Sequence, residues 1–188
     1  MSLLTTPSQT VGPYLRIGFL PLLIDAIAPA AVPGERITIR GRMSDGDGKP
    51  VSDAVLEIWQ ADAQGKYAHP EDGQKTIVAN AFRGFGRVLT DGGGAFRFTT
   101  IKPGPVAGPD GKQQAPHLVV TVFMRGMLRH LITRMYFPGE PLNETDPVLQ
   151  RVPVDRRATL VATAGSEKSM LEWNVVSQGS AETVFFDF

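Results

Sequence analysis

Two residues of types that bind metals lie about fifty positions apart in this chain of 188 residues. Tyr67 follows a Gly65-Lys66 turn, and His117 precedes the apolar run Leu118-Val119-Val120. Side chains alternate between the faces of a strand, so two histidines spaced i, i+2 can reach one metal. Here the position at i+2 is Val119, which cannot bind a metal. Taken singly, Tyr67 is most often a packed aromatic residue and a lone histidine is most often structural.

The elements that must position these residues are predicted to be strands. Alternating or β-rich segments are 36–40, 55–59, 95–99, 118–123, 131–137, 159–163, 171–176 and 183–188. Turn signals separate them at 45–48, 62–65, 91–94 and 109–111. Helical periodicity is weak, and one short helix is predicted at 147–152 with Asp146 as its N-cap. The pattern predicts an all-β sandwich core over residues 35–188.

The first 34 residues are predicted to be an irregular arm, because Pro7, Pro13, Pro21, Pro29 and Pro33 interrupt an apolar segment. Two interpretations remain open from the residues alone. The arm packs on its own domain as a loop, or it packs against a partner chain.

Composition excludes several classes of function. There is no cysteine, which excludes disulfide scaffolds, zinc ribbons, iron–sulfur clusters and thiol nucleophiles. Lysine plus arginine equals aspartate plus glutamate, which argues against nucleic-acid or anionic-membrane partners. The apolar run 17–32 is too interrupted to span a bilayer, and residues 1–9 lack the basic cluster of a signal peptide. We therefore expect a cytoplasmic protein.

Several blocks stand together in an order typical of one enzyme family. They are Leu56-Glu57-Ile58-Trp59-Gln60-Ala61, Gly65-Lys66-Tyr67, Phe85 to Asp91, Thr100-Ile101-Lys102-Pro103-Gly104-Pro105, Pro116-His117, Thr133 to Phe137 and Thr183 to Phe188. From about residue 7 to the end, the chain resembles the intradiol ring-cleaving dioxygenases, in particular those that cleave protocatechuate. The resemblance implies an intradiol-type β-sandwich with long loops, and a role in the catabolism of aromatic compounds.

The family holds a ferric ion with two tyrosines, two histidines and a solvent hydroxide, because phenolates and hydroxide neutralise a hard trivalent cation. By resemblance, Tyr67 matches the first tyrosine ligand and His117 the first histidine ligand. Val106 stands at the second tyrosine position and Val119 at the second histidine position. Gln114 replaces an arginine that stabilises charge on the ring. Two ligands are too few to retain iron.

Other side chains do not fill these gaps. His69 lies in the loop after Tyr67, His130 precedes an apolar strand, and Tyr136 is predicted to pack in the core. The resemblance therefore implies a non-iron-binding, α-type subunit. Its Fe(III) is bound by a homologous β-type partner chain in a hetero-oligomer with protocatechuate and O2 as substrates.

In such an assembly the arm of the α-type chain lines the partner's active site. By resemblance, the lining residues here are Gly12, Pro13 and Tyr14. Glycine permits close backbone approach, and proline forms a rigid apolar wall. Arg125 is the predicted cation for the substrate carboxylate, with Arg134 as a second choice.

Two alternatives remain. One is an autonomous dioxygenase that uses Tyr67 and His117 with His69 or His130. The other is a non-enzymatic, transthyretin-like β-sandwich binding module, against which the apolar segment 7–32 argues, because exposed apolar surface usually marks an interface.

Overall fold

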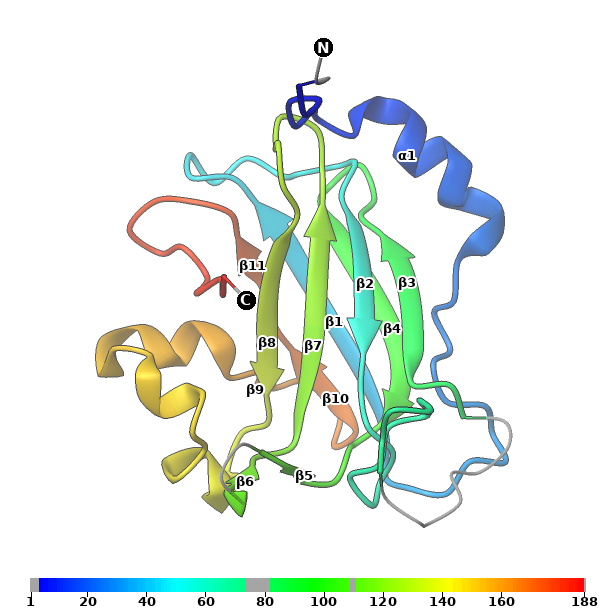
Figure 1. Cartoon of the computed structure of the whole chain (residues 1–188), viewed down its shortest axis with the longest axis vertical. Coiled ribbons are helices and arrows are strands. Elements are labelled where there is room, and N and C mark those ends of the chain that lie inside the picture. Colours follow the sequence, from blue (N-terminus) through cyan, green and yellow to red (C-terminus); the bar gives the residue numbers. More distant parts are fainter. Residues whose placement is uncertain (1–3, 74–81, 109–110, 188) are drawn as a thin grey trace.

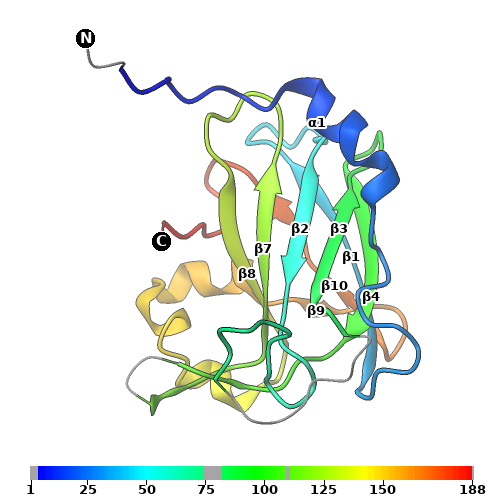
Figure 2. The same cartoon turned by 45° about the vertical axis from the view of Figure 1, so that its right-hand side comes forward.

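The chain folds mostly into strands, arranged in two main sheets (Figures 1 and 2). The computed structural model describes residues 4–73, 82–108 and 111–187. Helices in this part are few and short. The strand-rich class predicted from alternation and turn spacing is confirmed.

The first sheet is built around β1, which is the longest strand. Its members are β1 (Arg36–Ser44), β4 (Ala95–Ile101), β9 (Thr163–Ala164), β10 (Met170–Glu172) and β11 (Val175–Val176). Strand β4 pairs antiparallel with β1, whereas β10 and β11 pair parallel with it.

The second sheet has the order β3-β2-β7-β8 and carries the residues of chemical interest. Its strands are β2 (Val55–Trp59), β3 (Phe85–Leu89), β7 (His117–Phe123) and β8 (Leu131–Tyr136), all paired antiparallel. A separate two-stranded ladder joins β5 (Val106–Ala107) to β6 (Gln113–Gln114).

One apolar core joins the inner faces of the two sheets. Ile39 and Phe98 of the first sheet and Leu56, Leu118 and Val120 of the second are buried in it. Side chains alternate between faces, so Trp59, His117, Val119, Arg134 and Tyr136 belong to the other face of the second sheet. The 3-10 turns η3 (Pro141–Glu144), η4 (Leu149–Arg151) and η5 (Val154–Leu160) lie beside β8 (Figure 1). They contribute to a second apolar cluster that includes Tyr136.

The predicted strands near residues 40, 57, 97, 120 and 134 are confirmed as β1, β2, β4, β7 and β8. Strand β3 was missed, because Gly86 interrupts its alternation. A Cβ at Gly86 would lie 2.4 Å from Ile27, so the position requires glycine.

The C-terminal strand predictions were confirmed only in part. In segment 159–163, the first two residues end η5, Val161 forms an isolated bridge with Tyr136, and Thr163 begins β9. The Thr159 hydroxyl donates to the Arg156 carbonyl and accepts from the Val184 amide. Such local side-chain bonds compete with a strand ladder. Segment 171–176 is split into β10 and β11. In segment 183–188, Phe186 forms an isolated bridge to Ile132, and Phe188 lies outside the described residues.

The turns predicted at 45–48, 62–65 and 91–94 are confirmed. In each, an aspartate carbonyl accepts from a glycine amide three residues later. Residues 109 and 110 of the fourth predicted turn lie outside the described part. The helix predicted at 147–152 is the shorter 3-10 turn η4, but Asp146 does cap it by accepting from the Val148 and Leu149 amides at 2.9 and 2.8 Å.

The prediction that prolines exclude a regular element from the arm was wrong. Helix α1 (Gly12–Phe19) is followed by the 3-10 turn η1 (Leu20–Leu22). Pro13 occupies the first turn of α1, where a missing N–H costs no hydrogen bond. Within the described residues, no helix has the length and apolar character needed to cross a membrane.

The later part of the predicted arm packs on its own domain. Ile27, Ala28 and Val32 are buried, and Ile24 forms a backbone bridge with Arg87. The side chain of Arg36 donates to carbonyls in this segment, among them Val32 at 2.6 Å. The domain boundary at residue 34 stays a prediction, and no residue of 4–26 is buried.

Candidate functional site

Gly65 and Gly104 allow the two loops that carry Tyr67 and Val106 to pack closely against each other. Gly65 has φ +80°, and a Cβ there would lie 1.9 Å from the Pro105 carbonyl oxygen. The Gly104 amide donates to the Asp62 carbonyl at 2.8 Å, while Asp62 Oδ1 accepts from the amides of Gln64 and Lys66. The Gly-Lys-Tyr and Lys-Pro-Gly-Pro blocks are therefore two halves of one interlocked structure.

A buried glutamine ties this structure to both sheets. Gln60, at the end of β2, donates to the Ile101 carbonyl and accepts from the Thr100 hydroxyl at 2.6 Å. It is fully buried, so its hydrogen bonds hold the ends of β2 and β4 in place.

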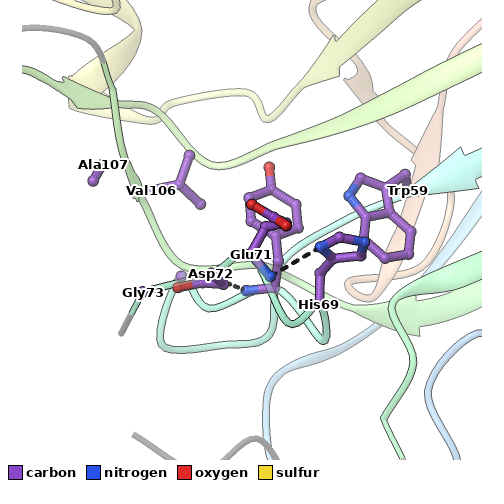
Figure 3. A pocket seen from close by; sticks show the side chains of 9 residues that line it. Trp59, His69, Glu71, Asp72, Gly73, Val106 and Ala107 are labelled. Atoms are coloured by element: carbon purple, nitrogen blue, oxygen red, sulfur yellow. Dashed lines mark hydrogen bonds between the residues drawn. The ribbon is translucent and has the colours of Figure 1, made fainter. Parts of the chain in front are cut away.

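A pocket of about 850 Å³ opens beside Tyr67. Tyr67 stacks on Trp59 with ring centroids 5.9 Å apart and planes 5° apart, and His69 meets Trp59 edge-on. Figure 3 shows Val106 and Ala107 on one side of the pocket, facing Trp59 and His69 on the other. Burial raises the pKa of Tyr67, the charge of Arg134 lowers it and that of Asp72 raises it. Tyr67 is therefore a neutral phenol near pH 7.

His117 begins β7 and is 4% exposed. Its Nδ1–H donates a hydrogen bond of 2.7 Å to the Ala115 carbonyl oxygen. Burial, followed by the charge of Arg134, lowers the pKa of His117 from 6.5 to about 4, against the opposing effects of the Ala115 carbonyl and Asp146. The imidazole is therefore neutral at physiological pH.

Arg134 lies on β8 directly opposite Val119 of β7, and Val119 is opposite Trp59 of β2. Its side chain is buried, and its Nη1 donates to Gln114 Oε1 at 2.6 Å. The next pair along the strands is His117 with Tyr136. Tyr136 is fully buried, as predicted, and its hydroxyl also donates to Asp146 Oδ1 at 3.1 Å. Burial raises the pKa of Tyr136 above its usual value.

At the far end of β7, the arm meets the hairpin that joins β7 to β8. The Gly126 amide donates to the Thr10 hydroxyl at 2.9 Å across 116 positions of sequence. Arg125, beside this contact, forms an ion pair with Asp53, and its side chain remains 59% exposed. The predicted residues Gly12 to Tyr14 and Arg125 therefore flank one hydrogen bond.

Helix α1 is held mainly at its two ends. At its C-terminal end, the guanidinium carbon of Arg87 lies 4.1 Å from the Phe19 ring centroid, and Arg87 also donates to the Leu22 carbonyl. None of the residues of α1 is buried, and Tyr14 is 80% exposed. The helix lies at the end of the sheets where the β7–β8 hairpin turns (Figure 2).

Comparison with known proteins identifies the family. Residues 25–179 match the Dioxygenase family. The protocatechuate 3,4-dioxygenase alpha chain of Burkholderia cepacia is 42% identical, with 97% of this chain and 96% of the relative covered. The chain belongs to the intradiol dioxygenase family. The beta chain of the same enzyme from that organism is also related, at 40% identity over 69% of this chain and 56% of the relative.

Solved intradiol dioxygenases share the fold. The dioxygenase domain of a carbohydrate-binding fusion protein from Streptomyces sp. SirexAA-E is 27% identical, with a TM-score of 0.64 over 93% of this chain and 99% of that one. A 3-chlorocatechol 1,2-dioxygenase from Rhodococcus opacus 1CP has a TM-score of 0.65 over 93% of this chain and 67% of that one.

Intradiol dioxygenases are iron-dependent, but the residues in this pocket do not fit a ferric ion. Val106 in the pocket wall and Val119 on β7 offer no ligand atom, and Arg134, opposite Val119 on β8, is a cation. Among the described residues, no three His, Cys, Asp or Glu side chains are grouped as metal ligands. His69 lines the pocket, whereas His130 lies against Phe123 at the far end of β7. We therefore derive no iron chemistry from this chain.

Sequence reasoning missed the polar network behind the pocket. Arg134 was considered for the substrate carboxylate and Asp146 only as a helix cap, yet both are connected to Tyr136. One signal was available. Arg134 and Tyr136 are spaced i, i+2 on a predicted strand next to the one that carries His117, so they share a face with it.

Proposed function

We propose that this chain is the α-type, non-iron-binding subunit of a hetero-oligomeric protocatechuate 3,4-dioxygenase. The observation that carries the proposal is the set of four predicted ligand positions: Tyr67 and Val106 line the pocket, and His117 and Val119 lie on β7. Two of the four are valines, in a chain similar over nearly its whole length to α chains. The two sheets would be the family's β-sandwich. The related β chain supports a homologous partner that binds Fe(III).

The proposed complex would use O2 to open the ring of protocatechuate between its two hydroxylated carbons, which gives 3-carboxy-cis,cis-muconate. This is a step in the β-ketoadipate route of aromatic catabolism. We place the enzyme in the cytoplasm, as expected from its sequence, and a chain without cysteine and so without disulfides is compatible with this.

The proposed role of this chain is to scaffold the assembly and to wall the partner's active site. Gly12, Pro13 and Tyr14 would form the wall, and Arg125 would supply positive charge for the substrate carboxylate. The Thr10 to Gly126 hydrogen bond supports a common position for arm and hairpin, and the exposure of Tyr14 and Arg125 leaves both accessible to a partner. Exposed apolar residues such as Ile17 and Leu22 favour a covered surface here.

Truncation of the arm tests this role in the complex co-expressed with the β-type chain. Removing residues 1–16 deletes Thr10 and the proposed wall, and we expect kcat/KM for protocatechuate to fall about 100-fold, since misplacement of positioning groups has effects of this size. Removing residues 1–8 keeps Thr10 and is the matched control. Equal kcat/KM in both truncated complexes would reject the role of the arm.

The isolated full chain tests the two alternative functions. On its own it is expected to hold no stoichiometric, coloured ferric site and to cleave no protocatechuate. Cleavage without a second chain would establish the autonomous dioxygenase. A stable monomer that does not associate with the β-type chain would favour the transthyretin-like binding module.

A further inference from the structure

Arg134 lies beside the positions on β7 from which His117 and residue 119 would hold a metal. Strand register places it opposite Val119, one of the two positions predicted to have lost a ligand. Its charge lowers the pKa of Tyr67, His117 and Tyr136, so all three lie within the electrostatic range of the guanidinium. The residue is 9% exposed, which keeps this charge inside the protein.

Hydrogen bonds hold the guanidinium in this position. Nη1 donates to Gln114 at 2.6 Å and lies 3.5 Å from the Tyr136 hydroxyl. Gln114 is in turn opposite Val106 in the β5–β6 ladder, the other position predicted to have lost a ligand. One side chain is therefore connected to both predicted gaps in the ligand set.

A buried carboxylate, that of Asp146, balances the charge of Arg134 through the intervening Tyr136 hydroxyl. Asp146 is fully buried and accepts from the Tyr136 hydroxyl and from the amides of Ala115, Val148 and Leu149. The chain Arg134–Tyr136–Asp146 pairs one positive and one negative charge through a neutral phenol. A buried charge without such compensation would be strongly destabilising.

We propose that Arg134 is a built-in cation that excludes metal from this pocket, so that two missing ligands are only part of the reason why the chain does not hold iron. A guanidinium stays protonated in proteins and cannot relieve the repulsion by losing its proton. A ferric ion beside it would meet like charge in a poorly solvated site, where repulsion is strongest. The proposal uses the predicted ligand positions and does not depend on the proposed partner.

The proposal predicts that restoring the ligands alone fails. The variant Val106→Tyr/Val119→His would complete a two-tyrosine, two-histidine set around Arg134. Adding Arg134→Met removes the charge at similar length. Adding Arg134→Lys instead keeps a cation and is the matched control. Adding Arg134→Gln is a second neutral replacement that retains hydrogen-bonding capacity toward Gln114 and Tyr136.

The test loads each full-length variant with ferrous ammonium sulfate in air, removes unbound metal and measures iron per chain together with the visible tyrosinate-to-iron absorption. Near-ultraviolet circular dichroism confirms folding. We expect the two neutral variants to retain at least about tenfold more iron than the double variant and the lysine variant, with the coloured band only in the neutral pair. Comparable iron in the double and neutral variants would overturn the proposal. So would a neutral variant that folds and still retains no more iron than the double variant, and one folded neutral variant is enough for the comparison.

Discussion

The two ends of strand β7 present opposite chemistry. At its start, His117 is buried among Arg134, Tyr136 and Asp146, and the polar groups there are bonded mainly to one another. At its finish, the hairpin and the arm expose apolar side chains, with Tyr14 at 80% and Leu128 at 63%. The polar groups of the first end are mostly paired within the protein, with Arg134 Nε as a buried exception, whereas the second end has surface that a partner could cover.

This difference teaches where to look for the function of a family member that lacks a complete metal site. A pocket of about 850 Å³ lies beside Tyr67. The cation near the predicted ligand positions, however, is the buried side chain of Arg134. The other end has a smaller pocket of about 390 Å³ between arm and hairpin and brings together residues 10 and 126, and it is there that we place the contribution to catalysis. Substitutions that change one end of β7 at a time can test this contrast.

The largest effect is expected from Asp146→Ala at the buried end. The substitution removes four hydrogen bonds and leaves the Arg134 charge without its counter-ion. The free energy of unfolding of the isolated chain should fall by about 3–5 kcal/mol in urea denaturation. Asp146→Asn keeps an acceptor and should cost clearly less. A loss below about 1 kcal/mol for the alanine variant would show that Asp146 does not stabilise the network of Arg134 and Tyr136.

His117 should make the buried end sensitive to acid. Its pKa is about 4 when folded and 6.5 otherwise, so above pH 6.5 both states are neutral and the residue has no effect. As the pH falls from 6.5 to 4, only the unfolded state takes up the proton, and stability falls by a total of about 3 kcal/mol. The difference in unfolding free energy between wild type and His117→Gln, measured across this range, should show the trend. The same comparison with His69→Gln is the exposed control, and identical pH profiles for the two variants would contradict the prediction.

Tyrosine-to-phenylalanine changes compare the two ends directly. Tyr136→Phe removes a buried hydroxyl that donates to Asp146, and it should destabilise the isolated chain by about 1–2 kcal/mol. Tyr14→Phe alters an exposed side chain and should change stability by less than about 0.5 kcal/mol. If both variants lose the same unfolding free energy in thermal or urea denaturation, the proposed difference between the two ends of β7 is wrong.

The smallest effect concerns Arg125 at the exposed end. In the co-expressed complex, Arg125→Ala should raise the KM for protocatechuate about fivefold, since it removes a cation proposed to face the carboxylate. Arg125→Lys should keep most of the affinity. Arg42→Ala, an exposed arginine of β1 in the other sheet, is the control for general loss of charge. A KM that shifts equally in the Arg125→Ala and Arg42→Ala complexes would place Arg125 away from the substrate.

Prediction of strands from sequence succeeded where apolar and polar residues clearly alternate. It failed where side chains form local hydrogen bonds in place of strand pairing. Strand β4 alternates through Phe96 and Phe98, and its bounds were found almost completely. Segment 159–163 is equally rich in β-branched residues, yet Thr159 uses its hydroxyl within a 3-10 turn. In the arm, Pro13 was read as a helix breaker although at the first turn it is compatible with a helix.

The sequence by itself determined the strand-rich class, the family and the gaps at Val106 and Val119. Residue type decides whether a side chain can bind a metal, and the family's blocks stand in one order along the chain. Only the tertiary structure decided that Arg134 lies opposite Val119 and that Thr10 meets Gly126. Both contacts depend on strand register and hairpin position, which arise from packing across the whole core and leave no periodic signal in the chain.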